Sequence, residues 1–201
     1  MEGIVNNLVS EIYKGMKDKL DILWPEKDNF FPPEANLVFE LARLGEKFHY
    51  FSYGEANVGK HNRRDMILIN SKDNWICQVE VKLVNSETIN EGSVVEDLKR
   101  VMNKDELTNF INKYAKDQNI KCFRKYGLFI GGDISHMFSW WNTNLLSESI
   151  KQFYKKYISD VEEKHEELRL YLTKSTYGIV PKDPEETKLW LVYALFNLDK
   201  N

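Results

Sequence analysis

The chain has 201 residues, of which 42% are hydrophobic and 29% are charged, values typical of a globular domain with a sizeable core. Its net charge of −3 excludes a uniformly basic surface, so any contact with nucleic acid has to come from a local patch. Cys77 and Cys122 lie outside any CxxC spacing, which excludes a cysteine-based zinc module and a disulfide framework and favours the cytoplasm. No apolar run is long enough to cross a bilayer, so we expect no membrane association.

Two amphipathic helices are predicted at the start of the chain. Residues 4–23 carry apolar side chains at three- to four-residue spacing, and Pro25 ends this helix. Residues 34–45 fit a second helix, with Gly45 at its C-terminal cap and Glu40 beside its apolar stripe.

Three strand-like runs follow these helices. Residues 48–53 are aromatic and end at Gly54. Residues 64–69 are followed by the polar segment 70–74, which predicts a hairpin turn into a third strand over residues 75–84.

Helices and strands alternate in the second half of the chain. Residues 93–115 show helical spacing with a break near 103–105, and residues 125–132 form a short buried strand. Residues 145–172 are predicted to be a charged helix. The apolar run 189–196 follows a helix start signal but is continuous enough for a buried strand, which we favour.

Alternation along the third strand separates an apolar face from a polar face, because successive side chains point to opposite sides. Glu80 and Lys82 share the polar face, and Asp65 on the preceding antiparallel strand can lie beside Glu80. Two converging carboxylates repel each other unless a cation intervenes, and Mg²⁺ prefers oxygen ligands. A nearby lysine can orient a water or neutralise charge on a phosphate. These residues therefore predict a divalent-metal phosphodiesterase site.

The spacing of Asp65, fourteen intervening residues and the triplet Glu80-Val81-Lys82 resembles the motif of the PD-(D/E)XK nuclease superfamily. The resemblance implies that Asp65 and Glu80 bind Mg²⁺ or Mn²⁺, with the backbone carbonyl of Val81 as a further ligand. It implies that Lys82 is the base that orients or activates water. Glu40 matches the acidic residue that many members carry on the first core helix, where it binds metal directly or through water.

The resemblance also implies a fold. It predicts an α/β protein with an αβββαβ restriction-endonuclease-like core and a mixed central sheet over residues 34–132, inside a single domain that spans 1–201. The N-terminal helix precedes this core, and residues 133–201 form a C-terminal helical elaboration. Arg64 stands where the family often has proline, a replacement that weakens the match without breaking it.

Basic side chains near the motif are candidates for phosphate contacts. A basic cluster precedes Asp65, and the alternative interpretation of this cluster is a solvated loop. In the family the helix after the motif often faces the substrate backbone. The candidates are Lys60, His61, Arg63 and Arg64 from the cluster, and Lys99 and Arg100 from the helix.

Three functional hypotheses follow. The first is a Mg²⁺- or Mn²⁺-dependent endonuclease that cuts DNA in restriction, defence or repair, where a homodimer would cut both strands. The second is an RNase or structure-specific nuclease, which uses the same site because the phosphodiester is common to both nucleic acids. The third is a catalytically inactive nuclease-like binding or assembly protein, which the sequence pI of about 5.9 favours and the joint presence of Asp65, Glu80 and Lys82 opposes.

Overall fold

The computed structural model describes residues 1–23, 34–58, 62–84, 92–133, 167–168, 170–180 and 190–200. Its helices are α1 (Glu2–Leu23), α2 (Glu34–Arg43), α3 (Gly45–Phe48), α5 (Ser93–Met102) and α6 (Lys104–Tyr114), with a 3-10 helix η1 (Gln118–Cys122). Its strands are β1 (Phe51–Asn57), β2 (Arg63–Asn70), β3 (Trp75–Val84), β4 (Arg124–Asp133), β5 (Thr176–Val180) and β6 (Trp190–Asn197). Within these ranges, no helix combines the length and the apolar character needed to cross a membrane.

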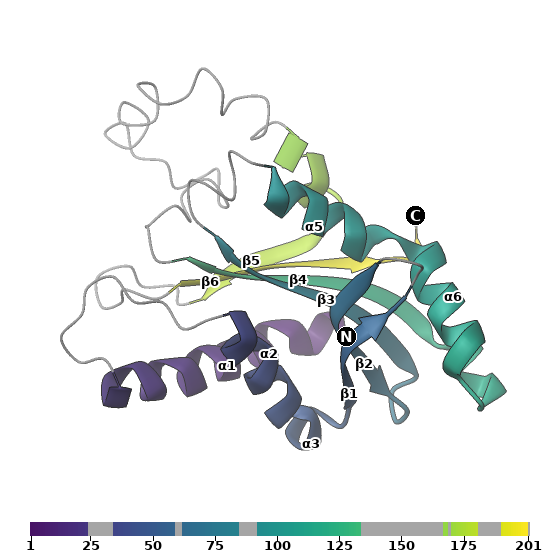
Figure 1. Cartoon of the computed structure of the whole chain (residues 1–201), viewed down its shortest axis with the longest axis horizontal. Coiled ribbons are helices and arrows are strands. Elements are labelled where there is room, and N and C mark those ends of the chain that lie inside the picture. Colours follow the sequence, from purple (N-terminus) through teal and green to yellow (C-terminus); the bar gives the residue numbers. More distant parts are fainter. Residues whose placement is uncertain are drawn as a thin grey trace.

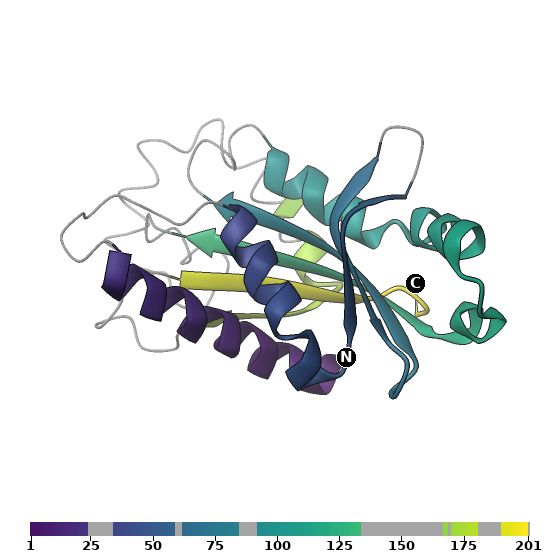
Figure 2. The same cartoon turned by 60° about the horizontal axis from the view of Figure 1, so that its bottom comes forward.

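The described strands form one mixed sheet in the order β1-β2-β3-β4-β6-β5. Strands β1, β2 and β3 pair antiparallel, β4 lies parallel to β3, and β6 and β5 continue antiparallel. Helices α1, α2 and α3 cover one face of the sheet, and α5 and α6 lie on the other (Figure 1). Figure 2 shows α1 and α2 lying across the first of these faces. The protein is therefore a mixed α/β fold with helices on both sides of its sheet.

Each face of the sheet has its own apolar core. Leu8, Ile12 and Met16 of α1 are fully buried in the first core, which confirms the predicted stripe of the N-terminal helix. On the other side, Gly127 of β4 lets α5 approach closely, because a Cβ at this position would overlap the carbonyl of Val101. Close packing of α5 against β3 and β4 follows from this contact.

The predicted boundary between the second helix and the first strand is wrong. Gly45 does not end the helical region but begins α3, and the strand begins only at Phe51. His49 adopts the left-handed conformation with φ of 57°, and the hydroxyl of Tyr50 donates a hydrogen bond to the carbonyl of Leu41. The helical turn therefore continues to Phe48, where the predicted strand begins, and the left-handed His49 ends it.

The predicted hairpin between β2 and β3 and the predicted break at Asn103 are both confirmed. Asn70 closes the hairpin turn by accepting a hydrogen bond from the N–H of Asp73 at 2.7 Å. The side chain of Asn103 accepts from the N–H of Glu106 and caps the start of α6.

The C-terminal part contributes strands as well as helix. The favoured strand at 189–196 is confirmed as β6, which pairs with β4. Strand β5 was not predicted, and it extends the sheet beyond β6. Residues 134–166 lie outside the described residues, so the predicted helix at 145–172 is tested only at its end, where 167–168 and 170–172 are helical.

Strand β1 changes the face that its side chains occupy. The ring of Tyr53 lies 5.9 Å from the ring of Phe110 on α6, whereas Ala56, three residues later, belongs to the core on that same side. Regular alternation would put these two side chains on opposite faces. Glu55 lies between them with a positive φ of 46°, which identifies the position where the strand twists.

Candidate functional site

The predicted division of β3 into two faces is confirmed. On the polar face, the amide of Gln78 binds the end of α5, the carboxylate of Glu80 pairs with Arg100, and the ammonium of Lys82 approaches Asp97. All three contacts are made to α5 or to the residues that follow it. The side chains of the apolar face, which join the core beneath α1 and α2, are Trp75, Cys77, Val79 and Val81.

Asp65 lies where β2 separates from β3. Arg64 faces α5 whereas Met66 joins the opposite core, so alternation along β2 is interrupted at Asp65. Pairing between the two strands ends at Met66 and Val79, and beyond it Asp65 Oδ2 accepts a hydrogen bond from the N–H of Val81 at 2.7 Å. Because the N–H and C=O of one residue in an extended strand point to the same neighbour, the carbonyl of Val81 also faces Asp65.

The carboxylate of Glu80 is almost completely buried. Its Oε2 accepts a hydrogen bond from Arg100 Nη2 at 2.9 Å. Its Oε1 lies 3.5 Å from Arg64 Nη1 but accepts no hydrogen bond from the described residues. Glu80 therefore has one oxygen that accepts a hydrogen bond and one that does not. A buried acceptor without a hydrogen bond costs about 1–3 kcal/mol.

The electrostatic environment couples the acidic side chains of this site. Burial, and then the negative charge of Asp65, raise the pKa of Glu80 to about 8, against the opposing charges of Arg100 and Arg64. Burial also raises the pKa of Asp97 to about 6, and Asp65 adds to this shift. Such raised pKa values mean that the charged forms lack enough positive charge around them, so the site favours uptake of a proton or a cation.

Two polar side chains from the sheet hold the end of α5 over the site. Gln78 Nε2 donates to the carbonyls of Val101 at 2.8 Å and Asn103 at 3.0 Å. Arg64 Nη2 donates to the carbonyl of Arg100 at 2.8 Å. The last carbonyls of a helix have no partner within the helix and carry partial negative charge. The donors of Gln78 and the positive charge of Arg64 therefore stabilise the end of α5. This contact fixes α5 above the polar face of β3.

Two cations on the solvent side complete the cluster. Arg100 Nη2 bridges Glu80 Oε2 and Asp97 Oδ1, at 2.9 and 2.6 Å, and the Arg100 side chain is 45% exposed. Lys82 Nζ lies 4.0 Å from Asp97 Oδ2 and is partly exposed. Both side chains can therefore move into solvent without disturbing the core.

Glu40 packs on the α1 side of the sheet, away from the polar face of β3. Its Oε2 accepts a hydrogen bond from Arg43 Nε at 2.7 Å, and it packs against α1, where a Cβ at Gly15 would stand 2.5 Å from that oxygen. The residue of α2 that reaches the motif strand is Glu34, whose Oε1 accepts from the N–H of Leu83 at 2.8 Å. The expectation that Glu40 contributes to the metal site is therefore not supported by its position.

The predicted phosphate contact of Arg64 is wrong. Its side chain is 0% exposed, because it caps α5 and forms an ion pair with Glu106 of α6. A buried guanidinium cannot reach a phosphate in solvent. Arg64 is therefore a structural cation that ties β2 to the helices.

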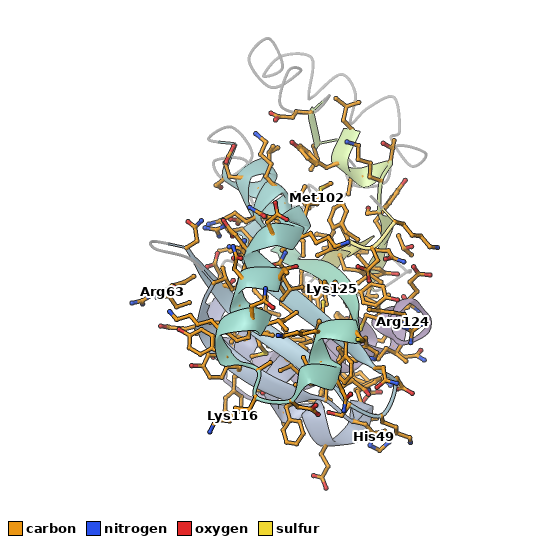
Figure 3. The ribbon with its side chains drawn as sticks, turned by 90° about the vertical axis from the view of Figure 1, so that its right-hand side faces the viewer. His49, Arg63, Met102, Lys116, Arg124 and Lys125 are labelled. Atoms are coloured by element: carbon orange, nitrogen blue, oxygen red, sulfur yellow. The ribbon has the colours of Figure 1, made fainter. Side chains whose placement is uncertain are left out.

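The other predicted phosphate contacts differ in their accessibility. Arg63 is largely exposed, pairs weakly with Glu55, and extends away from the ribbon in Figure 3. Lys99 is partly exposed and forms ion pairs with Glu96 and Glu167. Lys60 and His61 lie outside the described residues.

The donor set of the site fits a hard divalent cation in part. In the part of the chain that the structure describes, no group of three or more His, Cys, Asp or Glu side chains is arranged to hold a metal ion. However, Mg²⁺ typically uses one or two carboxylates, and waters and substrate oxygens complete its coordination. The unsatisfied Oε1 of Glu80, the carboxylate of Asp65 and the carbonyl of Val81 offer such donors once Arg100 leaves Glu80.

Sequence reasoning missed Asp97 and Glu34. Asp97 precedes Arg100 by three residues on one helix face, a spacing that could have indicated a pair directed at β3. Glu34 follows two prolines at a helix start, where its reach to a neighbouring strand has no sequence signal. Comparison of the chain with protein-family models, curated proteins and solved structures finds no match, so its interpretation rests on this geometry.

Proposed function

We propose that the protein is a divalent-metal-dependent phosphodiesterase that hydrolyses nucleic acid, with DNA as the favoured substrate. The observation that carries this proposal is the buried Oε1 of Glu80, which accepts no hydrogen bond from the described residues. Lys82 shares this strand face, and the negative charge of Asp65 helps to raise the pKa of Glu80. The order α2-β1-β2-β3-α5-β4, with β4 parallel to β3, adds support, because it is the order expected of an αβββαβ core.

In this proposal the two carboxylates and the carbonyl of Val81 hold Mg²⁺ or Mn²⁺. The bound cation supplies positive charge that polarises the phosphate and acidifies a coordinated water. Lys82 orients the attacking water or neutralises charge that develops on the phosphate. The oxygen of water bonds to phosphorus and releases one proton to solvent, the ester P–O bond breaks, and the leaving oxygen takes up a proton from solvent.

Arg100 has a second role in this proposal. Its guanidinium lies between the carboxylates of Glu80 and Asp97 and pairs with both. A divalent ion at Glu80 would repel it, and its exposed side chain could then turn outward to a substrate phosphate. Metal entry and phosphate binding would be coupled through this one side chain.

A second function is favoured by the same contacts. Arg64 and Arg100 both pair with Glu80, so the protein could keep the fold as a non-catalytic binding or assembly module in which arginines replace the metal. The two functions differ in whether Mn²⁺ binds.

Calorimetric titration with Mn²⁺ and a cleavage panel test both functions. The panel compares single- and double-stranded DNA and RNA, with Mg²⁺, with Mn²⁺ and with chelator. Wild type is expected to bind Mn²⁺ and to cut, and the isosteric variants Glu80→Gln and Asp65→Asn are expected to lose both properties. The matched control is Glu55→Gln, because Glu55 is an exposed acid of the neighbouring strand.

The outcomes separate the alternatives. Undiminished cleavage by Glu80→Gln contradicts the proposed site. Absence of both Mn²⁺ binding and cleavage in the wild type favours the binding module. Cleavage of RNA alone retains the mechanism and reassigns the substrate.

A further inference from the structure

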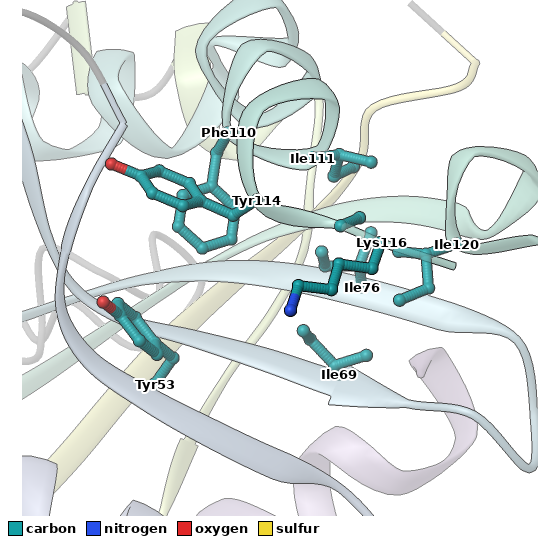
Figure 4. Close-up of a pocket in the computed structure, with 9 residues that line it drawn as sticks. Tyr53, Ile69, Ile76, Phe110, Ile111, Tyr114, Lys116 and Ile120 are labelled. Atoms are coloured by element: carbon teal, nitrogen blue, oxygen red, sulfur yellow. The ribbon is translucent and has the colours of Figure 1, made fainter. Parts of the chain in front are cut away.

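A separate cavity of about 440 Å³ lies under α6, on the same sheet face as the charged cluster but at the other end of β3. Ile76 of β3 lines it, four residues before Glu80, which corresponds to about 13 Å along the strand. The buried side chains of Gln78 and Arg64 lie between the two sites. Figure 4 shows the cavity between the end of α6 and strands β1, β2 and β3.

The wall of this cavity is almost entirely apolar. Phe110 lies at its back, with its ring 5.9 Å from that of Tyr53 and 5.1 Å from that of Tyr114. Tyr53 and Tyr114 are 56% and 47% exposed, so they form an aromatic rim that is open to solvent. The remaining apolar lining residues are Ile69, Ile76, Ile111, Ala115 and Ile120.

Such a volume is not an ordinary packing defect. The cavity opens to solvent, and its volume lies within the range of about 300–1,000 Å³ that sites for small molecules occupy. An apolar wall with rigid aromatic side chains at its entrance provides contact area for a flat or aliphatic body at a low cost in side-chain entropy.

One cation marks the entrance. The side chain of Lys116 lines the cavity and its ammonium lies over the opening in Figure 4. In the described parts of the chain Lys116 forms no ion pair, whereas Lys82 and Lys99 have acidic partners. An apolar cavity beneath a cation complements a molecule that combines an apolar body with one negative group.

We propose that this cavity binds a small organic anion, with its aromatic or aliphatic body against the isoleucines and Phe110 and its carboxylate, phosphate or sulfonate at Lys116. This site is independent of the proposed phosphodiesterase. It requires neither a metal nor any residue of the charged cluster.

Fluorescence titration of the full chain with anilinonaphthalene sulfonate tests this site, since this probe is an aromatic body with one negative group. N-phenylnaphthylamine, a neutral molecule with the same ring system, serves as the matched ligand. We expect saturable binding of the anion at one site per chain and weakening by about fivefold in Lys116→Gln, with little change for the neutral probe. Lys113→Gln is the control, because Lys113 Nζ lies 4.9 Å from the centroid of the Tyr114 ring and Lys113 does not line the cavity.

A second variant tests the cavity itself. Ala115→Trp adds bulk at the lining and is expected to abolish binding of both probes, while circular dichroism and the unfolding midpoint report that the fold persists. Displacement of the bound anion by decanoate or by thymidine monophosphate then distinguishes a carboxylate metabolite from a nucleotide. Unchanged anion binding in a folded Ala115→Trp protein, or an equal effect of Lys116→Gln and Lys113→Gln, overturns the proposal.

Discussion

On one face of β3, Cys77, Val79 and Val81 pack among the apolar side chains of α1 and α2. On the other face, Gln78 and Glu80 are equally buried but present polar atoms to α5. The two faces belong to the same ten-residue strand and share its backbone hydrogen bonds. They differ only in what their side chains require from their surroundings.

The comparison of the two faces of β3 separates side chains that serve folding alone from side chains that carry polar or charged groups. Apolar burial stabilises the protein without further conditions, at about 25 cal/mol per Å². Buried charges are costly to desolvate, and apolar residues of similar volume often serve stability equally well or better. The proposed function gives a reason for the buried charge on the polar face, because groups with perturbed pKa values gather at functional sites.

The largest expected effect is on cleavage. Asp65→Ala, Glu80→Ala and Lys82→Ala should each reduce the single-turnover rate by about 10³-fold or more, because each removes a group to which the proposed function assigns contact with the cation or the phosphate. Glu55→Ala, on the exposed edge strand, should leave the rate unchanged. A Glu80→Ala protein that cuts at the wild-type rate would remove the distinction between the two faces.

A second comparison concerns stability. Arg64→Met should lower the free energy of unfolding by about 3 kcal/mol, because Glu80 and Glu106 lose a buried partner. Leu128→Ala on the apolar face should cost about 2–5 kcal/mol through the cavity that it leaves. Adding Glu80→Gln should recover part of the loss in Arg64→Met but none in Leu128→Ala. Urea denaturation measures both double variants, and equal recovery in the two backgrounds would contradict the separation of the faces.

A smaller effect is expected in the pH dependence of the free energy of unfolding. In the native state burial raises the pKa of Glu80 to about 8 from its ordinary value of 4.5, so the folded protein binds this proton more tightly than the unfolded chain. The free energy of unfolding in chelator should therefore fall as the pH rises from about 4.5 to about 8. Glu80→Gln should flatten the upper part of this slope, as followed by urea midpoints at several pH values. An identical slope in the variant would show that another group is responsible.

The smallest expected effect is at Arg63. Because its side chain is exposed and only weakly paired, Arg63→Ala should weaken DNA binding a few-fold and lower the salt slope by about one unit, without changing sequence preference. Fluorescence anisotropy at several salt concentrations measures this slope. Lys72→Ala, in the turn at the far end of the same hairpin, is the control. Equal effects of the two substitutions would argue against a phosphate contact near the site.

The sequence predicted the regular features of the molecule because these depend on local periodicity. The faces of β3, the hairpin and the break at Asn103 follow from alternation and capping, which act within a few residues. The late start of β1 did not follow, because it depends on the left-handed His49 and on the contact of Tyr50 with α2. Strand β5 was missed because its five residues carry little periodic signal and are stabilised by pairing with β6.

The candidate site was predictable in its strand residues and not in its helix residues. Alternation brought Glu80 and Lys82 to one face, and the hairpin brought Asp65 near them. Arg64 was expected at the surface because arginine is rarely buried, and its burial depends on the end of α5, which lies 36 residues away in sequence. The same tertiary contact brings Asp97 and Arg100 to Glu80. Their spacing of three residues indicates a pair on one helix face, but the strand residue that they reach depends on the packing of α5.

A crystal of the protein soaked with Mn²⁺ and measured at a wavelength where manganese scatters anomalously tests the central claim most directly. We expect an anomalous peak between the carboxylates of Asp65 and Glu80, with the guanidinium of Arg100 turned away from Glu80. Absence of a peak at saturating Mn²⁺, with Arg100 still bridging Glu80 and Asp97, would contradict it.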